Sequence, residues 1–121
     1  MPLLLNAAAT RLTYAGVGSL DVHFSSGPGN HFFYLLAEGS GAKTFSNGTI
    51  TSPTCNSSSV TGIGRAAAEK IYYRALTVYM TSSTNYAGAR AATLSAAADL
   101  YPGNTTISNG VAAAWAAVNV N

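Results

Sequence analysis

Charged side chains are scarce in this chain of 121 residues. Asp, Glu, Lys and Arg together make up 8% of the sequence, against about a quarter in an average soluble domain. The six basic residues are spread from Arg11 to Arg90 and form no cluster, so we expect no nucleic-acid binding. Small and uncharged polar residues fill the remaining surface, which suits an extracellular protein or one that a partner covers.

Cysteine and long apolar runs are also rare. Cys55 is the only cysteine, which excludes an internal disulfide bond and a zinc site built from several thiolates. The opening "MPLLLNAAATRL" is too short an apolar run to span a membrane and has no basic residue ahead of it, so we expect no membrane anchor and no targeting signal. With 48% hydrophobic residues, the chain can bury one core of domain size.

Four stretches carry the apolar spacing of helices, and all but the second are bounded by Ser, Thr or Asn at the start and by Gly, Pro-Gly or a polar end. Pro28 suits the first turn of the first helix because its backbone angle is already helical. The expected bounds are from a Ser25 or Ser26 cap to Gly39, from about Gly62 to Met80, from a Thr84 or Asn85 cap to about Tyr101, and from a Thr105 or Thr106 cap to the closing "NVN".

Two short segments have the character of strands. Asn47-Gly48 lies between β-branched and aromatic residues and predicts a small hairpin near residues 44–51. The stretch "LDVHF" alternates apolar and polar residues, which indicates a short extended segment before the first helix.

The fold class that follows is mainly α, a compact bundle of four or so helices. The second helix should bury one apolar stripe, formed by Ala67, Ile71, Ala75 and Val78. We expect the largest buried side chains of the core to be Trp115, Ile71, Leu35 and Phe32.

Asp21 and His23 form a pair with a definite chemical use. In an extended segment, residues two apart project to the same side, so the carboxylate can accept a hydrogen bond from the imidazole. That bond would orient the ring and favour its charged form, which leaves the other N–H to donate to a developing negative charge. Spacing alone favours a plainer interpretation, in which Asp21 caps a turn and His23 is a polar residue with a satisfied hydrogen bond.

Three other arrangements are weaker. His23, His31 and Glu38 are the only residues that could give a two-histidine, one-carboxylate metal site, but the chain has no H-E-x-x-H pair. Ser25 and Ser26 near His23 lack the G-x-S-x-G elbow of a nucleophilic serine. Basic and aromatic residues of the second helix are more typical of a solvated face than of a nucleic-acid site; they are Arg65, Lys70, Arg74, Tyr72 and Tyr73.

Three longer blocks together are more specific than any of these pairs. They are "GSLDVHFSSGPGNHFFYLLAEGS", "VTGIGRAAAEKIYYRALTVYMTSSTNYAGARAATLSAAADLYPG" and "VAAAWAAVNV". In order and spacing they resemble the C-terminal α-helical domain of thermolysin-like (neutral) zinc metalloproteases, in particular the elastase-like branch. The resemblance divides the chain into an unmatched segment, 1–17, and the helical domain, 18–121. It implies the C-terminal domain of a secreted zinc metalloendopeptidase, which forms one wall of the active-site cleft.

The resemblance also assigns roles to the Asp-x-His pair. His23 matches the family histidine that donates a hydrogen bond to the oxyanion of the tetrahedral intermediate and is often described as the proton donor. Asp21 matches the carboxylate that orients this histidine in the elastase-like branch. In thermolysin itself the acid lies further upstream, where this chain has Gly18. Ser25 and Ser26 match the "SSG" that begins the following helix.

Most of the family's other functional residues precede the matching segment and have no counterpart in residues 1–17. These are the zinc ligands, the general base, the calcium ligands, a second oxyanion donor and most of the specificity pocket. The resemblance therefore implies no cofactor in this chain, with zinc and calcium in the full-length parent enzyme. Cys55 resembles a position that pairs with an upstream cysteine in some relatives, and that partner is absent. We expect the isolated chain to be unable to cleave peptides.

Two hypotheses remain open at this point. In the first, the chain acts on peptide or protein substrates together with the missing N-terminal catalytic domain. In the second, it is a non-catalytic helical module that binds a partner through the cleft-lining face. A coding stretch for H-E-x-x-H upstream of Met1 would favour the first.

Overall fold

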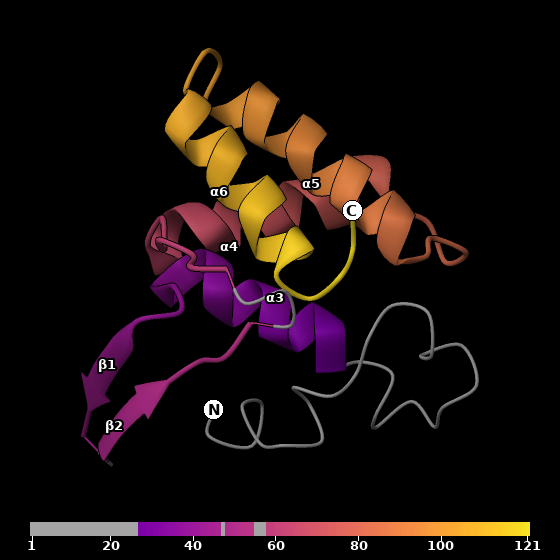
Figure 1. The fold of residues 1–121 in the computed structure, drawn as a ribbon. Coiled ribbons are helices and arrows are strands. Elements are labelled where there is room, and N and C mark those ends of the chain that lie inside the picture. The colour runs from indigo at the N-terminus through magenta and orange to yellow at the C-terminus, as the bar shows by residue number, and fades with distance from the viewer. Residues whose placement is uncertain (1–26, 47, 55–57) are drawn as a thin grey trace.

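The computed structural model describes residues 27–46, 48–54 and 58–121. Its elements, in chain order, are α3 (Gly27–Glu38), β1 (Ala42–Phe45), β2 (Gly48–Thr51), α4 (Arg65–Arg74), the π-helix η3 (Ala75–Tyr79), α5 (Tyr86–Leu100) and α6 (Thr105–Ala116). The prediction of a mainly helical fold with four helices and a small hairpin is confirmed (Figure 1). The extended segment expected before α3 lies outside the described residues.

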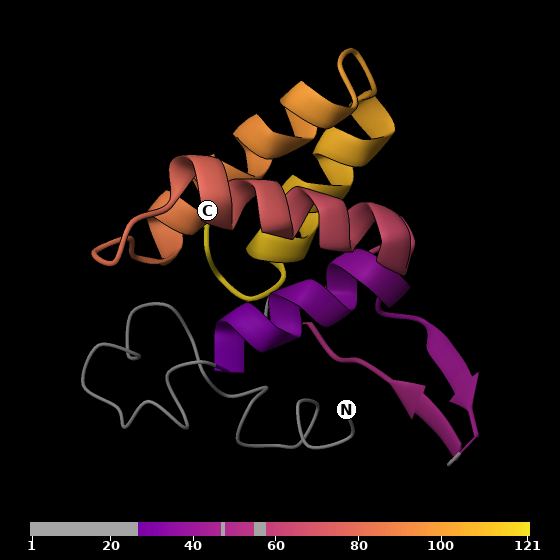
Figure 2. The same cartoon turned by 180° about the vertical axis from the view of Figure 1, so that it is seen from behind.

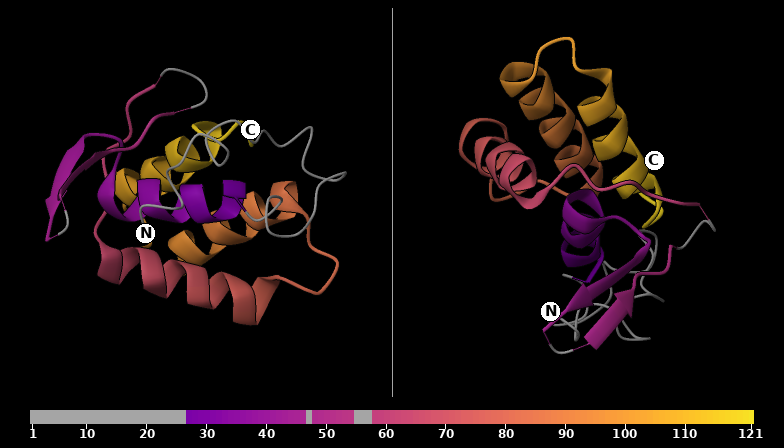
Figure 3. Two further views of the ribbon diagram at one scale, coloured as in Figure 1. Left: turned by 90° about the horizontal axis from the view of Figure 1, so that it is seen from below. Right: turned by 90° about the vertical axis from the view of Figure 1, so that its left-hand side faces the viewer.

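The helices pack directly on one another. α5 and α6 form a hairpin of helices, α4 packs against α5, and α3 packs against both α4 and α6 (Figures 1 and 2). Seen from below, α3 lies between α4 and α6 (Figure 3). The β1–β2 hairpin extends away from the helices and leaves from the C-terminal end of α3, so it lies far from the end at which the chain enters that helix (Figure 1).

A stacked pair of aromatic rings lies at the centre of the core. The rings of Phe32 on α3 and Trp115 on α6 are nearly parallel, with centroids 3.8 Å apart. Leu35 and Ile71 are fully buried around them, so all four large core residues expected from the sequence are confirmed. The rest of the core is largely alanine, and small side chains let the helix axes approach closely; its fully buried members are Ala68, Ala75, Ala96, Ala97, Ala114 and Ala117.

The connection from the hairpin to α4 runs along the C-terminal end of α3. Ser40 donates to Val60 O over 2.9 Å and Ile63 to Leu36 O over 2.7 Å, both from the backbone N–H. A Cβ atom on Gly62 would lie 2.6 Å from a backbone carbonyl oxygen of α3, so only glycine fits this approach. These bonds hold residues 60–64 in a non-helical path, and α4 begins at Arg65 instead of Gly62.

The second predicted helix changes type before it ends. Its last five residues, Ala75–Tyr79, form the π-helix η3, in which the backbone bonds run from i to i+5. The wider turn rotates Val78 out of the apolar stripe, and its side chain is 54% exposed. The prediction that Val78 belongs to the core is therefore wrong, whereas Ile71 and Ala75 of the same stripe are fully buried.

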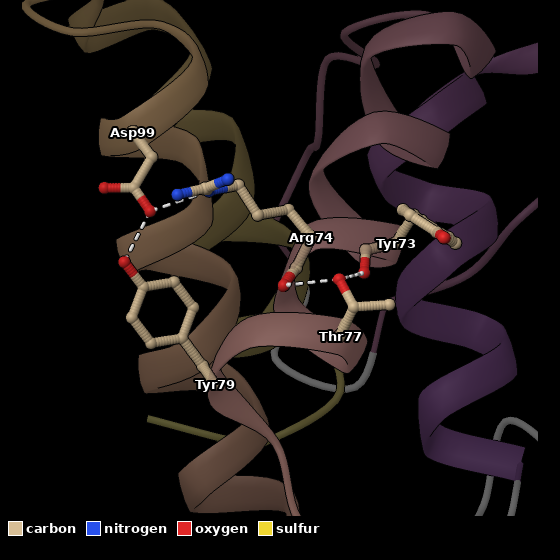
Figure 4. A network of polar contacts seen from close by, with 5 residues as sticks. All are labelled: Tyr73, Arg74, Thr77, Tyr79 and Asp99. Atoms are coloured by element: carbon tan, nitrogen blue, oxygen red, sulfur yellow. Dashed lines mark hydrogen bonds and ion pairs between the residues drawn. The ribbon is translucent and has the colours of Figure 1, made fainter.

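A polar network ties η3 to α5 (Figure 4). Arg74 Nε donates to Asp99 Oδ2 over 2.8 Å, and the Tyr79 hydroxyl donates to the same oxygen. Both bonds lower the pKa of Asp99, the tyrosine bond more than the arginine bond. Thr77 Oγ1 donates to Tyr73 O over 2.9 Å within the helix. The network is exposed, so water and salt weaken its contribution to stability.

Side-chain caps fix the starts of α5 and α6. Asn85 Oδ1 accepts from the Gly88 N–H over 2.8 Å, as expected for one of the two candidate caps of α5. At α6 the cap is Asn104, which accepts from the Ile107 N–H over 3.1 Å. The prediction of Thr105 or Thr106 was wrong because asparagine caps at least as well as threonine and stands just ahead of both.

The hairpin is confirmed, and β1 begins at Ala42. Its strands pair antiparallel, with Ala42 opposite Thr51 and Phe45 opposite Gly48. Gly48 has a φ of +128°, a conformation that favours glycine at this turn.

Candidate functional site

The predicted catalytic pair, Asp21 and His23, lies outside the described residues, so its placement stays a prediction. The structure describes the helix that follows. α3 begins at Gly27, four residues after His23, and Gly27, Pro28 and Gly29 are all buried. The chain that carries the pair therefore leads into a helix whose first turn is embedded in the fold.

Aromatic contacts hold α3 from two sides. Phe32 stacks on Trp115 of α6, and Phe33 meets Tyr72 of α4 edge to face with centroids 5.7 Å apart. Trp115 is fixed in turn because its Nε1–H donates to Thr93 Oγ1 of α5 over 2.8 Å. Offset and edge-to-face aromatic pairs stabilise beyond their buried area, so α3 is attached firmly to the other three helices.

His31 does not face open solvent. Its side chain is buried, and Nε2 lies 2.8 Å from Ser52 Oγ just after β2. The direction of this bond depends on which ring nitrogen carries the proton, and Ser52 Oγ also lies 3.4 Å from Pro53 O. Nδ1 has no hydrogen-bond partner among the described residues. Burial lowers the pKa of His31, so this imidazole is a neutral link between α3 and the hairpin.

We expect His31 to make the domain less stable in acid. The folded pKa lies below the ordinary value of 6.5, so the unfolded chain takes up a proton that the folded chain excludes. The stabilisation is fully present above pH 6.5 and is lost as the pH falls toward the folded pKa. Urea unfolding between pH 7.5 and 5 should show this decline, and His31→Gln should reduce it. An equal decline in both proteins would contradict the prediction, since His23 and the carboxylates are unchanged in the variant.

A surface groove lies between α3 and α4, and it was not predicted from the sequence. Its volume is about 410 Å³, and it begins at the first turn of α3. Its lining residues are Gly29, Asn30, Phe33, Glu69, Tyr72, Tyr73 and Leu76. Tyr73 is 70% exposed. Glu69, Tyr73 and Leu76 are four and three residues apart, and this spacing could have indicated that they share one face of α4 and the turn after it.

The basic and aromatic residues of α4 do not form one patch. Arg74 is paired with Asp99, and Tyr72 packs against Phe33. Arg65 and Lys70 are exposed. The arrangement is that of a solvated helix face.

The model of the family described as "Thermolysin metallopeptidase, alpha-helical domain" matches this chain over residues 6–120. The chain belongs to this family. The match begins ahead of Gly18 and so takes in part of the segment that the resemblance in the sequence left unmatched.

The relatives of this chain include a protein named as a metalloprotease and others named bacillolysin and thermolysin. The chain is 53% identical over 107 residues to the transglutaminase-activating metalloprotease of Streptomyces mobaraensis, covering 88% of this chain and 14% of that protein. It is 43% identical over 107 residues to a bacillolysin of Bacillus cereus (86% and 17%). It is 40% identical over 99 residues to a thermolysin of Alicyclobacillus acidocaldarius (82% and 16%). The chain thus spans less than a fifth of the length of these relatives.

The described part of this thermolysin-family domain does not fit a metal ion. It contains no group of three or more His, Cys, Asp and Glu side chains that could hold one. His31 Nε2 is engaged with Ser52, and Glu38 lies two turns further along α3. Within the same described residues, no helix combines the length and apolar character needed to cross a membrane.

Proposed function

We propose that this chain works as the C-terminal domain of a secreted zinc metalloendopeptidase and forms one wall of its active-site cleft. Peptide or protein substrates would bind between this wall and an N-terminal catalytic domain that carries zinc and its ligands, with calcium in the same parent. The observation that carries the proposal is the match to the thermolysin helical domain over residues 6–120. Support comes from a relative named as a metalloprotease, of which this chain covers only 14%.

In this proposal His23 and Asp21 act on the substrate carbonyl. One N–H of the imidazolium donates to the oxyanion that forms when the peptide bond is attacked, and the other donates to the Asp21 carboxylate. The carboxylate orients the ring and keeps it charged. A preformed donor aimed at developing charge lowers the barrier because it need not reorganise during the reaction. The role is consistent with the start of α3, four residues after His23, where Gly27, Pro28 and Gly29 are buried.

The isolated chain should be inactive. The metal in this family polarises the carbonyl and supplies hydroxide at neutral pH, and the described residues offer no place for it. We expect a calorimetric zinc titration of the purified 121-residue chain to show no stoichiometric binding and casein to remain uncut. Stoichiometric zinc binding together with casein hydrolysis would contradict this prediction.

A chimeric protease tests whether this chain supports peptide hydrolysis when it is joined to an N-terminal catalytic part. In it, the segment of the Streptomyces mobaraensis enzyme that matches this chain is exchanged for this chain, and the rest of that enzyme supplies the N-terminal part. We expect the chimeric protease to contain zinc and to hydrolyse casein. A folded chimera that binds zinc stoichiometrically but has no activity would overturn the proposal. The same enzyme with its own segment is the control.

A further inference from the structure

Exposed apolar side chains gather in the last turn of α4 and in η3. Among the described residues six large hydrophobic side chains are exposed, and four of them lie in this stretch; they are Tyr73, Leu76, Val78 and Tyr79. Tyr73 and Leu76 also line the groove between α3 and α4. A gathered apolar surface of this kind is typical of an interaction site.

The walls of this α3–α4 groove are preformed. Phe33 meets Tyr72 edge to face, and the Tyr72 ring also lies 6.4 Å from that of Phe32 in the core. At the start of α3, the Gly29 N–H donates to the Tyr86 hydroxyl over 3.3 Å. A ligand therefore need not order these walls when it binds. The volume of about 410 Å³ lies within the range of about 300–1,000 Å³ that is typical of ligand sites.

One negative charge lies on the groove and is not neutralised. Glu69 is the only charged residue that lines it, and among the described residues no cation forms an ion pair with this carboxylate. Arg74 is held by a carboxylate of α5 instead (Figure 4). Arg65 and Lys70 are exposed and do not line the groove. The groove thus offers aromatic and apolar walls with one carboxylate, which complements a ligand that is both apolar and cationic.

The carboxylate and the apolar end of the groove are separated along α4. This helix starts beside the C-terminal end of α3, where the Gly64 N–H donates to Ala37 O over 3.1 Å. Glu69 therefore lies toward that end of the groove, and Leu76 lies toward the first turn of α3. Seven residues of helix rise about 10 Å. Side chains two apart in an extended peptide share one side and lie about 7 Å apart, and the length of a lysine or arginine side chain spans the rest.

We propose that the α3–α4 groove is an exosite, a binding site for the protein substrate outside the segment that is cut. It binds an extended segment in which a basic side chain stands two residues from an apolar or aromatic one. The apolar side chain packs on Tyr73 and Leu76, and the basic side chain pairs with Glu69. The exosite role rests on the proposed function, whereas binding of the segment is a property of this chain alone.

An NMR titration of the 121-residue chain with the blocked peptide acetyl-Arg-Ser-Phe-Ser-Arg-amide tests the binding. We expect amide shifts in the groove and a Kd that rises about tenfold in Tyr73→Ala, because exposed tyrosines often dominate such contacts. Glu69→Gln should raise Kd by about two- to fivefold. The matched control is Glu38→Gln, which removes the same charge outside the groove and should leave Kd unchanged.

Three results of the titration would overturn the proposal. They are no amide shifts in the groove, an unchanged Kd in Tyr73→Ala, and an equal rise of Kd in Glu69→Gln and Glu38→Gln. The peptide acetyl-Glu-Ser-Phe-Ser-Glu-amide should bind more weakly than the arginine peptide, and equal binding of the two peptides would contradict the role of the carboxylate.

Sedimentation of the same chain tests a different occupant. We expect the parent chain and Tyr73→Ala to be monomers. A dimer of the parent chain that dissociates in Tyr73→Ala would mean that a second copy covers the groove, and it would overturn the proposal.

The chimeric protease tests the exosite role with two peptide substrates that share one cleaved sequence. One of them also carries Arg-Ser-Phe-Ser-Arg behind a Gly-Ser linker of about 20 residues, which spans about 25 Å. The added segment should lower KM by about threefold or more and leave kcat unchanged, and Tyr73→Ala should remove the difference.

The outcomes with the chimera separate the two proposals. If the folded, zinc-loaded chimera cuts neither substrate, the proposed function fails and the exosite role fails with it, while the titration still decides whether the groove binds the segment. If the chimera cuts both substrates with equal KM, only the exosite fails.

Discussion

Replacing His23 with alanine in the chimeric protease is expected to lower kcat by about two to four powers of ten while zinc content stays the same. The lower figure is typical of losing one oxyanion donor, and the higher figure of losing a general acid as well. KM should change little because the bond from His23 forms with charge that exists only in the transition state. Steady-state kinetics on a peptide substrate, with metal analysis of the same samples, give both quantities.

His31→Gln is the matched control for this prediction. The chain has two histidines, and His31 is bonded to Ser52 within the fold. Its replacement should leave kcat near the parent value at neutral pH. Unchanged kcat in His23→Ala would reject the role of His23, and a loss of zinc in that variant would indicate that it holds the metal instead.

Asp21 should matter less than His23. Asp21→Asn keeps a side chain of the same size but removes the charge that favours the imidazolium. We expect kcat to fall less than in His23→Ala and the fall to be larger at high pH, where an unassisted imidazole is neutral. A pH profile of kcat for the two variants checks the order. A loss in Asp21→Asn larger than that in His23→Ala would contradict the assigned roles.

Local sequence signals predicted the elements of the fold well. Asn47-Gly48 indicated the hairpin, and Gly39 marked the end of α3. The failures arise where distant segments decide the local conformation. α4 starts late because residues 60–64 bond to the end of α3, and the turn of helix after Arg74 is π rather than α. Neither effect has a signature within its own segment.

The site was predictable only in part, for the same reason. Asp21 and His23 could be named from a short pattern together with the family resemblance. The residues that hold α3 in place come from other helices, and no local pattern joins Gly29 to Tyr86 or His31 to Ser52. These contacts span 57 and 21 residues, so their partners emerge only when the helices are packed.

Replacing Trp115 with alanine is expected to destabilise the domain by about 3–5 kcal/mol. The indole is almost fully buried, stacks on Phe32 at 3.8 Å and donates to Thr93 Oγ1. Its removal opens a cavity between α3, α5 and α6. Because domains of this size are stable by only about 5–15 kcal/mol, the midpoint of urea unfolding of the 121-residue chain should fall sharply.

Two further variants separate the contribution of the aromatic stack from that of the hydrogen bond to Thr93, and a third serves as a surface control. Trp115→Phe keeps an aromatic ring against Phe32 but loses the bond to Thr93, and should remain folded if Trp115→Ala does not. Thr93→Val leaves the indole N–H buried without its acceptor and should cost about 1–3 kcal/mol. Tyr73→Ala, at a side chain 70% exposed, should change stability by less than about 0.5 kcal/mol. A loss in Trp115→Ala no larger than that in Tyr73→Ala would mean that the stack does not hold α3.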